Sequence, residues 1–399
     1  MRAETVEHLR APISGARLTL QPIEIAGDEV VCGRLVEIGT GAWYRIEEGI
    51  ADLAPHGFRN IDRHDAFCRR HGFEQGPVPA GNAVPDENAA MQIRFFSEHR
   101  DAYEIEVVAS PFFGVLDRVT LGRWASRAIG KDMLVAEVGC GTGRQTLPLL
   151  RSGASLVCVD LSEDMLRLAR RKALAEQPAG WADFVVGSAE NLPLADGRFD
   201  VAVIFGSLHH FSDPPAALRK VAGIMKAGGR FYILENHKSP ARFIFDWMMR
   251  RWMLWMEEPN EAPTAAQFLD WLGAGGLEAR VRYSTYLPPH LFYLVKGRAA
   301  DRLLVATDAL FNAVPVLRRL GGVIIAEGVK RGLGRSGEGE HARTRRAFRL
   351  CSPAPTRLPF CSRPLVPVGV FRCDAQNSDA IGGTADIDRP RPRSPPRLM

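Results

Sequence analysis

Several features that would assign the protein to a special class are missing from the sequence. It has no run of about 18 apolar residues, and its opening segment MRAETVEHLRAPISG lacks the apolar stretch of a signal peptide. These absences argue against a secreted or membrane-spanning protein and favour the cytoplasm. The cysteines are odd in number and show no CxxC spacing, so we expect neither a disulfide framework nor a metal site. They are Cys32, Cys68, Cys140, Cys158, Cys351, Cys361 and Cys373.

A strong excess of one charge is also missing. The net charge is +5 over 399 residues, and an arginine-rich tail supplies part of it, so no nucleic-acid partner is expected. A composition that is 46% hydrophobic and 24% charged is ordinary for a globular protein. From 332 to 399, Pro, Arg, Ser and Gly occur without apolar periodicity, which predicts a disordered tail.

The central part of the chain is regular and predicts an α/β fold over 112–331. Apolar runs alternate with amphipathic stretches, a pattern typical of parallel strands covered by helices on both faces. The sequence therefore predicts a doubly wound, mostly parallel sheet. The expected strands are 133–138, 155–159, 183–186, 199–205, 229–234, 277–283 and 323–326, and the expected helices are 116–129, 143–152, 162–176, 214–225, 264–272 and 299–310.

The segments before this core are less regular. Residues 1–60 read as short strands broken by glycines, which predicts a small β-rich module. Residues 61–111 are more polar and are expected to form a connector, with one helix over 86–96.

The strongest motif is AEVGCGTGRQ, which follows a predicted strand and begins a predicted helix. Gly139, Gly141 and Gly143 allow the backbone to turn tightly and approach a ligand that faces the helix amides. A nicotinamide-binding loop has its third glycine where this chain has Arg144. An NAD-dependent oxidoreductase is therefore a less favoured alternative.

A second motif follows the next predicted strand. Asp160 ends this strand, where a carboxylate can accept hydrogen bonds from both hydroxyls of a ribose. Its alternative role is to cap the following helix, but Ser162 is better placed for that. Ribose binding is the favoured interpretation of Asp160.

These motifs, together with the string GSAENLPLADGRFDVAVIFGSLHHF at 187–211, resemble the class I S-adenosylmethionine-dependent methyltransferases. The resemblance covers about residues 112–236 and is closest to the group that contains the ubiquinone and menaquinone methyltransferases. It implies that S-adenosylmethionine is the cofactor and that Glu137 lies near its methionine part. At the adenine, Ser188 replaces the family's aspartate, leaving the backbone of Ala189 and the carboxylate of Glu190. The full set of cofactor positions that the resemblance implies is Glu137, Gly139, Cys140, Gly141, Gly143, Asp160, Leu161, Ser188, Ala189, Glu190 and Phe205.

Three residues past the fourth and fifth predicted strands are candidates for proton transfer. His209, His210 and Glu235 lie at the sheet edge where ligands bind, and either type of side chain could take a proton from a methyl acceptor. A packing role is an equal alternative for the histidines, because the pair also occurs in family members that act on different substrates.

The string WYRIEEGIADLAP at 43–55 is similar to the end of a zinc-ribbon-like segment that precedes some bacterial methyltransferases. The family's paired cysteines are missing, and only Cys32 remains nearby. We therefore expect the shape of that segment without zinc, because a tetrahedral site needs four ligands.

The stretch FIFDWMMRRWMLWM at 243–256 belongs to an expected cap insertion over about 238–264. Its aromatic and methionine side chains could roof a pocket, contact a membrane surface peripherally, or pack as core.

The sequence as a whole predicts a methyltransferase that acts on a small, lipophilic metabolite. The alternative outside enzymes is a non-catalytic cofactor-binding or membrane-associated adaptor.

Overall fold

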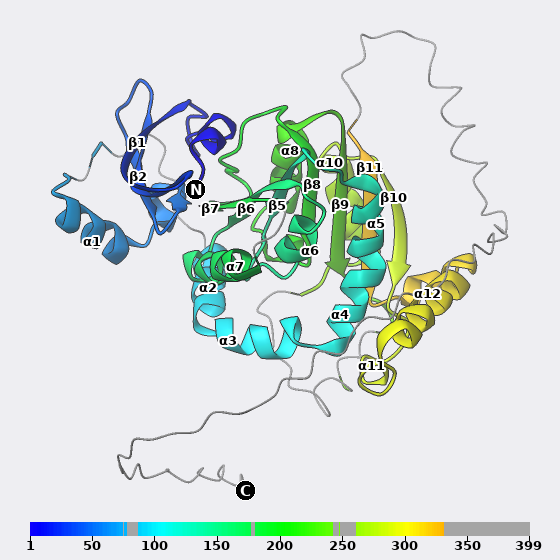
Figure 1. Ribbon diagram of the computed structural model, residues 1–399. Helices are drawn as coiled ribbons and strands as arrows, with labels where there is room; N and C mark the ends of the chain where they lie inside the picture. Colours follow the sequence, from blue (N-terminus) through cyan, green and yellow to red (C-terminus); the bar gives the residue numbers. More distant parts are fainter. Residues whose placement is uncertain (75, 78–86, 177–179, 242–246, 248–260, 331–399) are drawn as a thin grey trace, which may run out of the picture. The chain divides into compact units, whose positions relative to one another are not determined.

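The computed structural model describes residues 1–74, 76–77, 87–176, 180–241, 247 and 261–330 (Figure 1). The predicted tail over 332–399 lies outside these residues. The same holds for most of the predicted cap over 238–264, including all but Trp247 of the segment 243–256. No helix in the described part is long and apolar enough to cross a membrane.

The described residues form one sheet of eleven strands. Its order is β1-β2-β3-β4-β7-β6-β5-β8-β9-β11-β10. The strands are β1 (Leu18–Ala26), β2 (Glu29–Glu37), β3 (Trp43–Glu47), β4 (Ile50–Asp52), β5 (Leu134–Val138), β6 (Ser155–Asp160), β7 (Ala182–Val186), β8 (Phe199–Phe205), β9 (Met225–Asn236), β10 (Ala279–Ser284) and β11 (Val323–Val329).

The centre of this sheet is parallel, which confirms the predicted doubly wound fold. Strands β7, β6, β5, β8 and β9 pair in parallel, and β11 lies antiparallel between β9 and β10. The chain moves outward from β5 in one direction to β6 and β7, then returns to place β8 on the other side of β5. Ligands of open α/β sheets bind at such a switch point, beyond the carboxyl ends of the strands.

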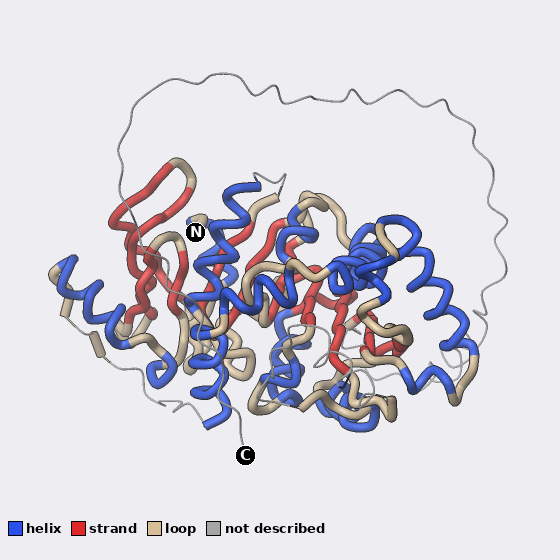
Figure 2. Tube along the Cα trace, turned by 90° about the horizontal axis from the view of Figure 1, so that it is seen from below, coloured by secondary structure: helices blue, strands red, loops and turns tan. Residues whose placement is uncertain are grey.

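Helices cover both faces of the sheet, as Figure 2 shows. Alternate residues of each buried strand join different apolar clusters: in β5, Ala136 packs with one cluster and Val135 with the other. The first cluster includes side chains of α8 (Pro214–Ile224) and α10 (Ala265–Ala274). The second includes those of α4 (Pro111–Asp117), η4 (Arg118–Gly122), α5 (Arg123–Ala128), α6 (Thr146–Leu150), α7 (Glu163–Glu176), α11 (Leu291–Leu294) and α12 (Gly297–Ala313).

The β-rich N-terminal segment is continuous with the central sheet. Strands β1 to β4 pair antiparallel, and β4 then pairs in parallel with β7, with Ile50 opposite Phe184. Leu35 and Tyr44 belong to the same apolar cluster as Val185 of β7. The N-terminal strands therefore lengthen the sheet that carries the central motifs.

The N-terminal segment was also expected to lack zinc. The described residues contain no group of three or more His, Cys, Asp or Glu side chains arranged to hold a metal ion. The Sγ atom of Cys32 lies 3.5 Å from Nε2 of His71. The absence of zinc stays a prediction, for which elemental analysis of the purified protein is the check.

The predicted connector contains more helix than its polar composition indicated. It includes α1 (Ile61–His71), α2 (Glu87–Glu98) and α3 (Arg100–Tyr103), of which only α2 was predicted. Helix α1 begins where the Asn60 side chain accepts a hydrogen bond from the Arg63 N–H, and it ends at Gly72, whose φ is 67°. In Figure 1 the chain from α2 to α4 follows the edge of the sheet at which the arrow of β9 ends.

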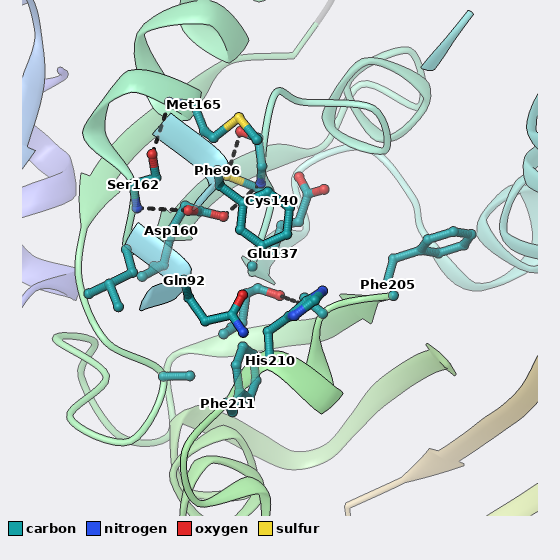
Figure 3. A pocket seen from close by; sticks show the side chains of 18 of the residues that line it. Gln92, Phe96, Glu137, Cys140, Asp160, Ser162, Met165, Phe205, His210 and Phe211 are labelled. Carbon is teal, nitrogen blue, oxygen red and sulfur yellow. Dashed lines mark hydrogen bonds between the residues drawn. The ribbon is translucent and has the colours of Figure 1, made fainter. Parts of the chain in front are cut away.

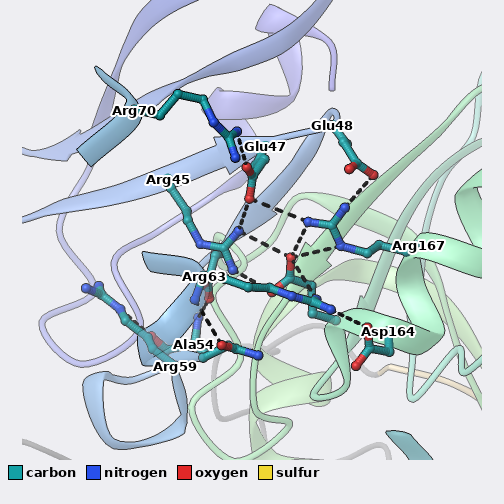
Figure 4. A network of polar contacts seen from close by, with 12 residues as sticks. Arg45, Glu47, Glu48, Ala54, Arg59, Arg63, Arg70, Asp164 and Arg167 are labelled. Atoms are coloured by element: carbon teal, nitrogen blue, oxygen red, sulfur yellow. Dashed lines mark hydrogen bonds and ion pairs between the residues drawn. The ribbon is translucent and has the colours of Figure 1, made fainter. Parts of the chain in front are cut away.

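A buried ionic network joins the N-terminal strands to α7 (Figure 4). The side chain of Arg45 is only 1% exposed and contacts Asp52 at 3.1 Å and Glu163 at 2.5 Å. Arg63 and Arg167 also pair with Glu163, at 3.3 and 2.8 Å. Glu163 is the first residue of α7, three residues after Asp160. The network therefore fixes the start of the helix that follows the predicted ribose-binding residue.

Candidate functional site

The glycine loop lies between β5 and α6 and is tied to the end of β6. The N–H groups of Gly139 and Cys140 both donate to the carbonyl of Val159, at 2.8 and 3.2 Å. Gly139, Gly141 and Gly143 have φ values of 74°, 54° and 80°, a backbone region that other residues rarely adopt. A Cβ at Gly139 would also collide with the side chain of Ser207.

Asp160 closes β6 beside this loop. Its Oδ2 accepts a hydrogen bond from the Gly141 N–H at 2.8 Å, and its Oδ1 accepts one from the Ser162 N–H at 2.9 Å. Desolvation raises the pKa of the Asp160 carboxyl group, and these backbone donors oppose the rise. Each oxygen has a second lone pair, so the carboxylate retains capacity to accept from a ligand.

Glu137 lies at the floor of the site and is 2% exposed. The Oγ1–H of Thr146 donates to its Oε2 at 2.6 Å, and the Sγ–H of Cys158 donates to the same oxygen at 3.6 Å. Burial raises the pKa of Glu137 to about 7, and the hydrogen bond from Thr146 acts in the opposite direction. The carboxyl group is therefore partly protonated near neutrality.

This pKa predicts how stability changes with pH. The folded-state pKa lies above the ordinary 4.5, so the stability that Glu137 contributes is fully present below pH 4.5 and is lost as the pH rises through about 7. The loss amounts to about 3 kcal/mol at most. Glu137→Gln carries no charge, so urea unfolding at pH 5 and pH 8 should show a smaller decline for the variant. An equal decline in both proteins would mean that Glu137 is not the group responsible.

The glycine loop, Asp160 and Glu137 line one pocket at the carboxyl ends of the strands (Figure 3). Of the predicted cofactor positions, the pocket is lined by Glu137, Gly139, Cys140, Gly141, Asp160, Leu161, Ala189, Glu190 and Phe205. Gly143 and Ser188 are not among the lining residues. A Cβ at Gly143 would meet Ala169 of α7 at 3.0 Å, so this glycine allows the loop to pack closely against that helix.

Ser188 lies beside the pocket and orients one of its lining residues. It is 2% exposed, and its Oγ–H donates to Oε2 of Glu190 at 2.5 Å. Oε1 of Glu190 accepts from the Ser212 N–H at 2.8 Å, which joins the end of β7 to the loop after β8. Ser188 and Glu190 thus lie together just past β7, and their contact with adenine stays a prediction from the sequence.

The three predicted proton-transfer residues are divided between the pocket and the interior. His210 lines the pocket, where its ring packs edge-on against Phe96 with 5.0 Å between ring centres. His209 and Glu235 do not line it; they are 5% and 0% exposed, and Nδ1 of His209 lies 2.7 Å from Oε1 of Glu235. Their predicted contact with a ligand is therefore not supported by the geometry of this pocket, because they pair with each other behind its wall.

The outer wall of the pocket comes from helices that were not predicted to contribute. Gln92 and Phe96 of α2 face the site, and Figure 3 shows both beside His210. The Asn88 side chain donates to the carbonyl of His210 at 3.2 Å, near one end of α2. Near the other end, the hydroxyl groups of Ser97 and Ser162 are 3.3 Å apart. These contacts hold α2 across the pocket.

Comparison with known proteins gives a consistent result for the region that carries these motifs. Residues 136–233 match the family described as a methyltransferase domain. A demethylmenaquinone methyltransferase of Symbiobacterium thermophilum is 30% identical over 157 residues, which cover 38% of this chain and 59% of that protein. A ubiquinone biosynthesis O-methyltransferase of Xanthomonas campestris pv. campestris is 31% identical over 129 residues, covering 32% and 53%. The chain thus spans less than two thirds of the length of these curated relatives.

Similarity to solved structures is lower. The structure of phosphoethanolamine N-methyltransferase 2 from Haemonchus contortus, in complex with S-adenosyl-L-methionine, matches with 16% identity and a TM-score of 0.41. The match covers 64% of this chain and 62% of that one.

Proposed function

We propose that this chain, whose residues 136–233 match a methyltransferase domain, uses S-adenosylmethionine to methylate a small, lipophilic acceptor in the pocket at the carboxyl ends of β5, β6, β8 and β9. The observation that carries the proposal is the convergence of the glycine loop, Asp160 and an apolar extension in one pocket. The part of the pocket beside the glycine loop and Asp160 suits a nucleoside, and the part lined by Phe205, Asn236 and Val323 is where we expect the acceptor.

The residues present fit the cofactor. Asp160 is held by two backbone N–H groups and would accept hydrogen bonds from the ribose hydroxyls. A Cβ at Gly141 would meet nothing within 4 Å, so this loop leaves open space beside Asp160. Leu161, Ala189 and Glu190 would surround the adenine, and Glu137 would lie near the methionine part.

S-adenosylmethionine supplies a methyl group that its sulfonium sulfur has already activated. With the cofactor held by Asp160 and the glycine loop, the acceptor's nucleophilic atom would gain the methyl group, and the electron pair of the broken carbon–sulfur bond would stay on sulfur. The protein must align the two molecules and exclude water. A proton leaves the acceptor when its nucleophile is a hydroxyl or an amine, and a nearby base can receive it.

The character of the pocket supports an apolar acceptor. Phe96, Phe113, Phe205 and Phe211 line it, together with aliphatic side chains. The two relatives named above are a demethylmenaquinone methyltransferase and an O-methyltransferase of ubiquinone biosynthesis, names that are in keeping with a ring-containing, lipophilic acceptor. Contact of the segment 243–256 with a membrane surface, which would suit such an acceptor, stays a prediction from the sequence.

We further propose that His210 takes the proton, whereas His209 and Glu235 hold the loop that carries it. His210→Gln should lower turnover by about a hundredfold at neutral pH while leaving the cofactor Kd within about twofold. The deficit should shrink as the pH rises, because an acceptor hydroxyl then ionises without a base. A pH-rate profile measures this effect. A constant deficit at all pH values would assign His210 to packing alone.

The experiment for the function as a whole combines the purified protein, methyl-labelled S-adenosylmethionine and a metabolite extract. A labelled small molecule extractable into organic solvent is the expected product. Label transfer only to water-soluble compounds would contradict the proposed acceptor class, and cofactor binding without any transfer would favour the adaptor alternative.

A further inference from the structure

The pocket is longer than the predicted cofactor contacts require. Its lining begins at Gly187 and Ala189, just past β7, and extends to Val323 at the start of β11. In the sheet, β7 and β11 are separated by the four strands β6, β5, β8 and β9. The pocket therefore extends over five strand-to-strand spacings. Neighbouring strands lie about 4.8 Å apart, so the pocket crosses roughly 24 Å of sheet edge. The predicted cofactor residues lie almost entirely on the half from β7 to β5.

The other half of the same pocket, which we call the acceptor compartment, is lined by Phe113, Leu116, Gln145, Phe205, Asn236 and Val323. Its strand residues are neighbours in the sheet, since Phe205 pairs with Leu234 on β9 and Asn236 pairs with Val323 on β11. The guanidinium of Arg144 joins this wall to α4, lying 4.5 Å from the ring centre of Phe113 and 5.2 Å from that of Phe205.

The only arginine that lines the described pocket is already neutralised. Arg144 donates from Nε to Oδ2 of Asp117 at 2.8 Å and from its NH2 group to Oδ1 at 2.6 Å. This bidentate arrangement satisfies the carboxylate and leaves no net positive charge for a ligand. Among the described lining residues, Arg144 is therefore no free counter-ion for a carboxylate on the acceptor, and desolvating that carboxylate beside Phe113 and Phe205 would cost free energy.

Gln145 is the polar group that this compartment leaves unsatisfied. It is 3% exposed, and neither its Oε1 nor its Nε2 has a hydrogen-bond partner among the described residues. Buried amides are nearly always hydrogen-bonded, because leaving one unpaired costs free energy. An amide offers one acceptor and one donor side by side, which matches a molecule with two adjacent oxygens, at least one of them a hydroxyl.

We propose that Gln145 determines acceptor specificity by binding a pair of adjacent oxygens on an uncharged ring, so that the enzyme accepts neutral catechol-type molecules and rejects their carboxylated counterparts. This inference rests on the proposed methyltransferase function. It adds the chemical class of the acceptor and the residue that selects it.

The test uses two probes that share a catechol ring, protocatechuate and its methyl ester, with labelled S-adenosylmethionine. The wild-type protein should methylate the neutral ester with a kcat/KM at least about tenfold above that for the carboxylate. Gln145→Met, which keeps the chain length without polar atoms, should reduce kcat/KM for the ester by about tenfold or more. Its cofactor Kd should stay within about twofold of the wild-type value.

Stability provides a second readout. Removing an unpaired buried amide should raise the Tm of the free Gln145→Met protein by about 2 °C. The control is Gln267→Met, the same change at an exposed amide whose Oε1 accepts from the Thr264 N–H at 2.9 Å. This control should lower Tm and leave turnover unchanged.

The failures can be told apart. Absence of S-adenosylmethionine binding in the wild-type protein would contradict the proposed function itself. Cofactor binding without methylation of the ester, or an equal rate on the carboxylate, would overturn the inference and leave that function standing. A Gln145→Met protein whose cofactor affinity falls more than about fivefold would assign the amide to the methionine part of the cofactor instead, which also overturns the inference.

Discussion

Asp160→Ala should bind S-adenosylmethionine about 10- to 150-fold more weakly than the wild-type protein, a loss of roughly 1.5 to 3 kcal/mol. The carboxylate is held by the N–H groups of Gly141 and Ser162, so its remaining lone pairs are already oriented for the ribose. The variant loses both the ligand contacts and the two backbone contacts that shape the loop. Isothermal titration calorimetry with the cofactor measures the effect.

The matched control is Asp200→Ala, on β8. Oδ2 of Asp200 also accepts a backbone hydrogen bond, from the Leu134 N–H at 3.0 Å, and Oδ1 pairs with Lys226 at 2.7 Å. It lies near the amino end of its strand, away from the pocket edge. Asp200→Ala should reduce stability without changing cofactor affinity. Equal losses of affinity in both variants would show that Asp160 acts only through the fold.

Arg45→Met should destabilise the protein by about 3 to 5 kcal/mol, because it removes the arginine that pairs with the buried carboxylate of Asp52 and leaves Glu163 with only Arg63 and Arg167 among the described residues. Burial lowers the pKa of Arg45, but Asp52 and Glu163 outweigh it and hold that pKa above its ordinary value. The same variant should weaken cofactor binding, since Glu163 begins the helix that follows Asp160. Urea unfolding followed by circular dichroism gives the free energy of unfolding.

Arg70→Met is the control for this network. Arg70 pairs with Glu47 at 2.7 Å, but its side chain is 59% exposed, so the loss should be at most about 1 kcal/mol. A similar cost for both arginines would contradict a special role for the buried pair. Normal cofactor binding by a destabilised Arg45→Met protein would separate the network from the site.

The part of the site built from local motifs could be predicted from the sequence. The loop needs glycine at three positions because their φ angles are positive, and its Gly141 N–H needs an acceptor, which Asp160 provides. Both residue types can be recognised in the sequence. His210 was predicted near the pocket on the same basis and lines it. His209 differs from it by one position but turns toward Glu235, a distinction that depends on side-chain packing.

Features that depend on long-range contacts could not be predicted. The pairing of β4 with β7 joins residues 50–52 to 184–186, and three-residue strands carry no periodic signal. An arginine in a strand, such as Arg45, is expected to be exposed. Arg45 is nevertheless buried, because Asp52 of β4 and Glu163 of α7 pair with it. Gln92 and Gln145 are ordinary helix-forming residues in the sequence, and only the fold encloses them in the pocket.

The central claim is that the pocket between β7 and β11 holds S-adenosylmethionine. The most direct measurement is a calorimetric titration of the full chain with S-adenosylmethionine, with NADH as the competing ligand. The account predicts binding of S-adenosylmethionine with a micromolar Kd, about 8 kcal/mol, and no heat with NADH. A clear heat of binding with NADH and none with S-adenosylmethionine would contradict it.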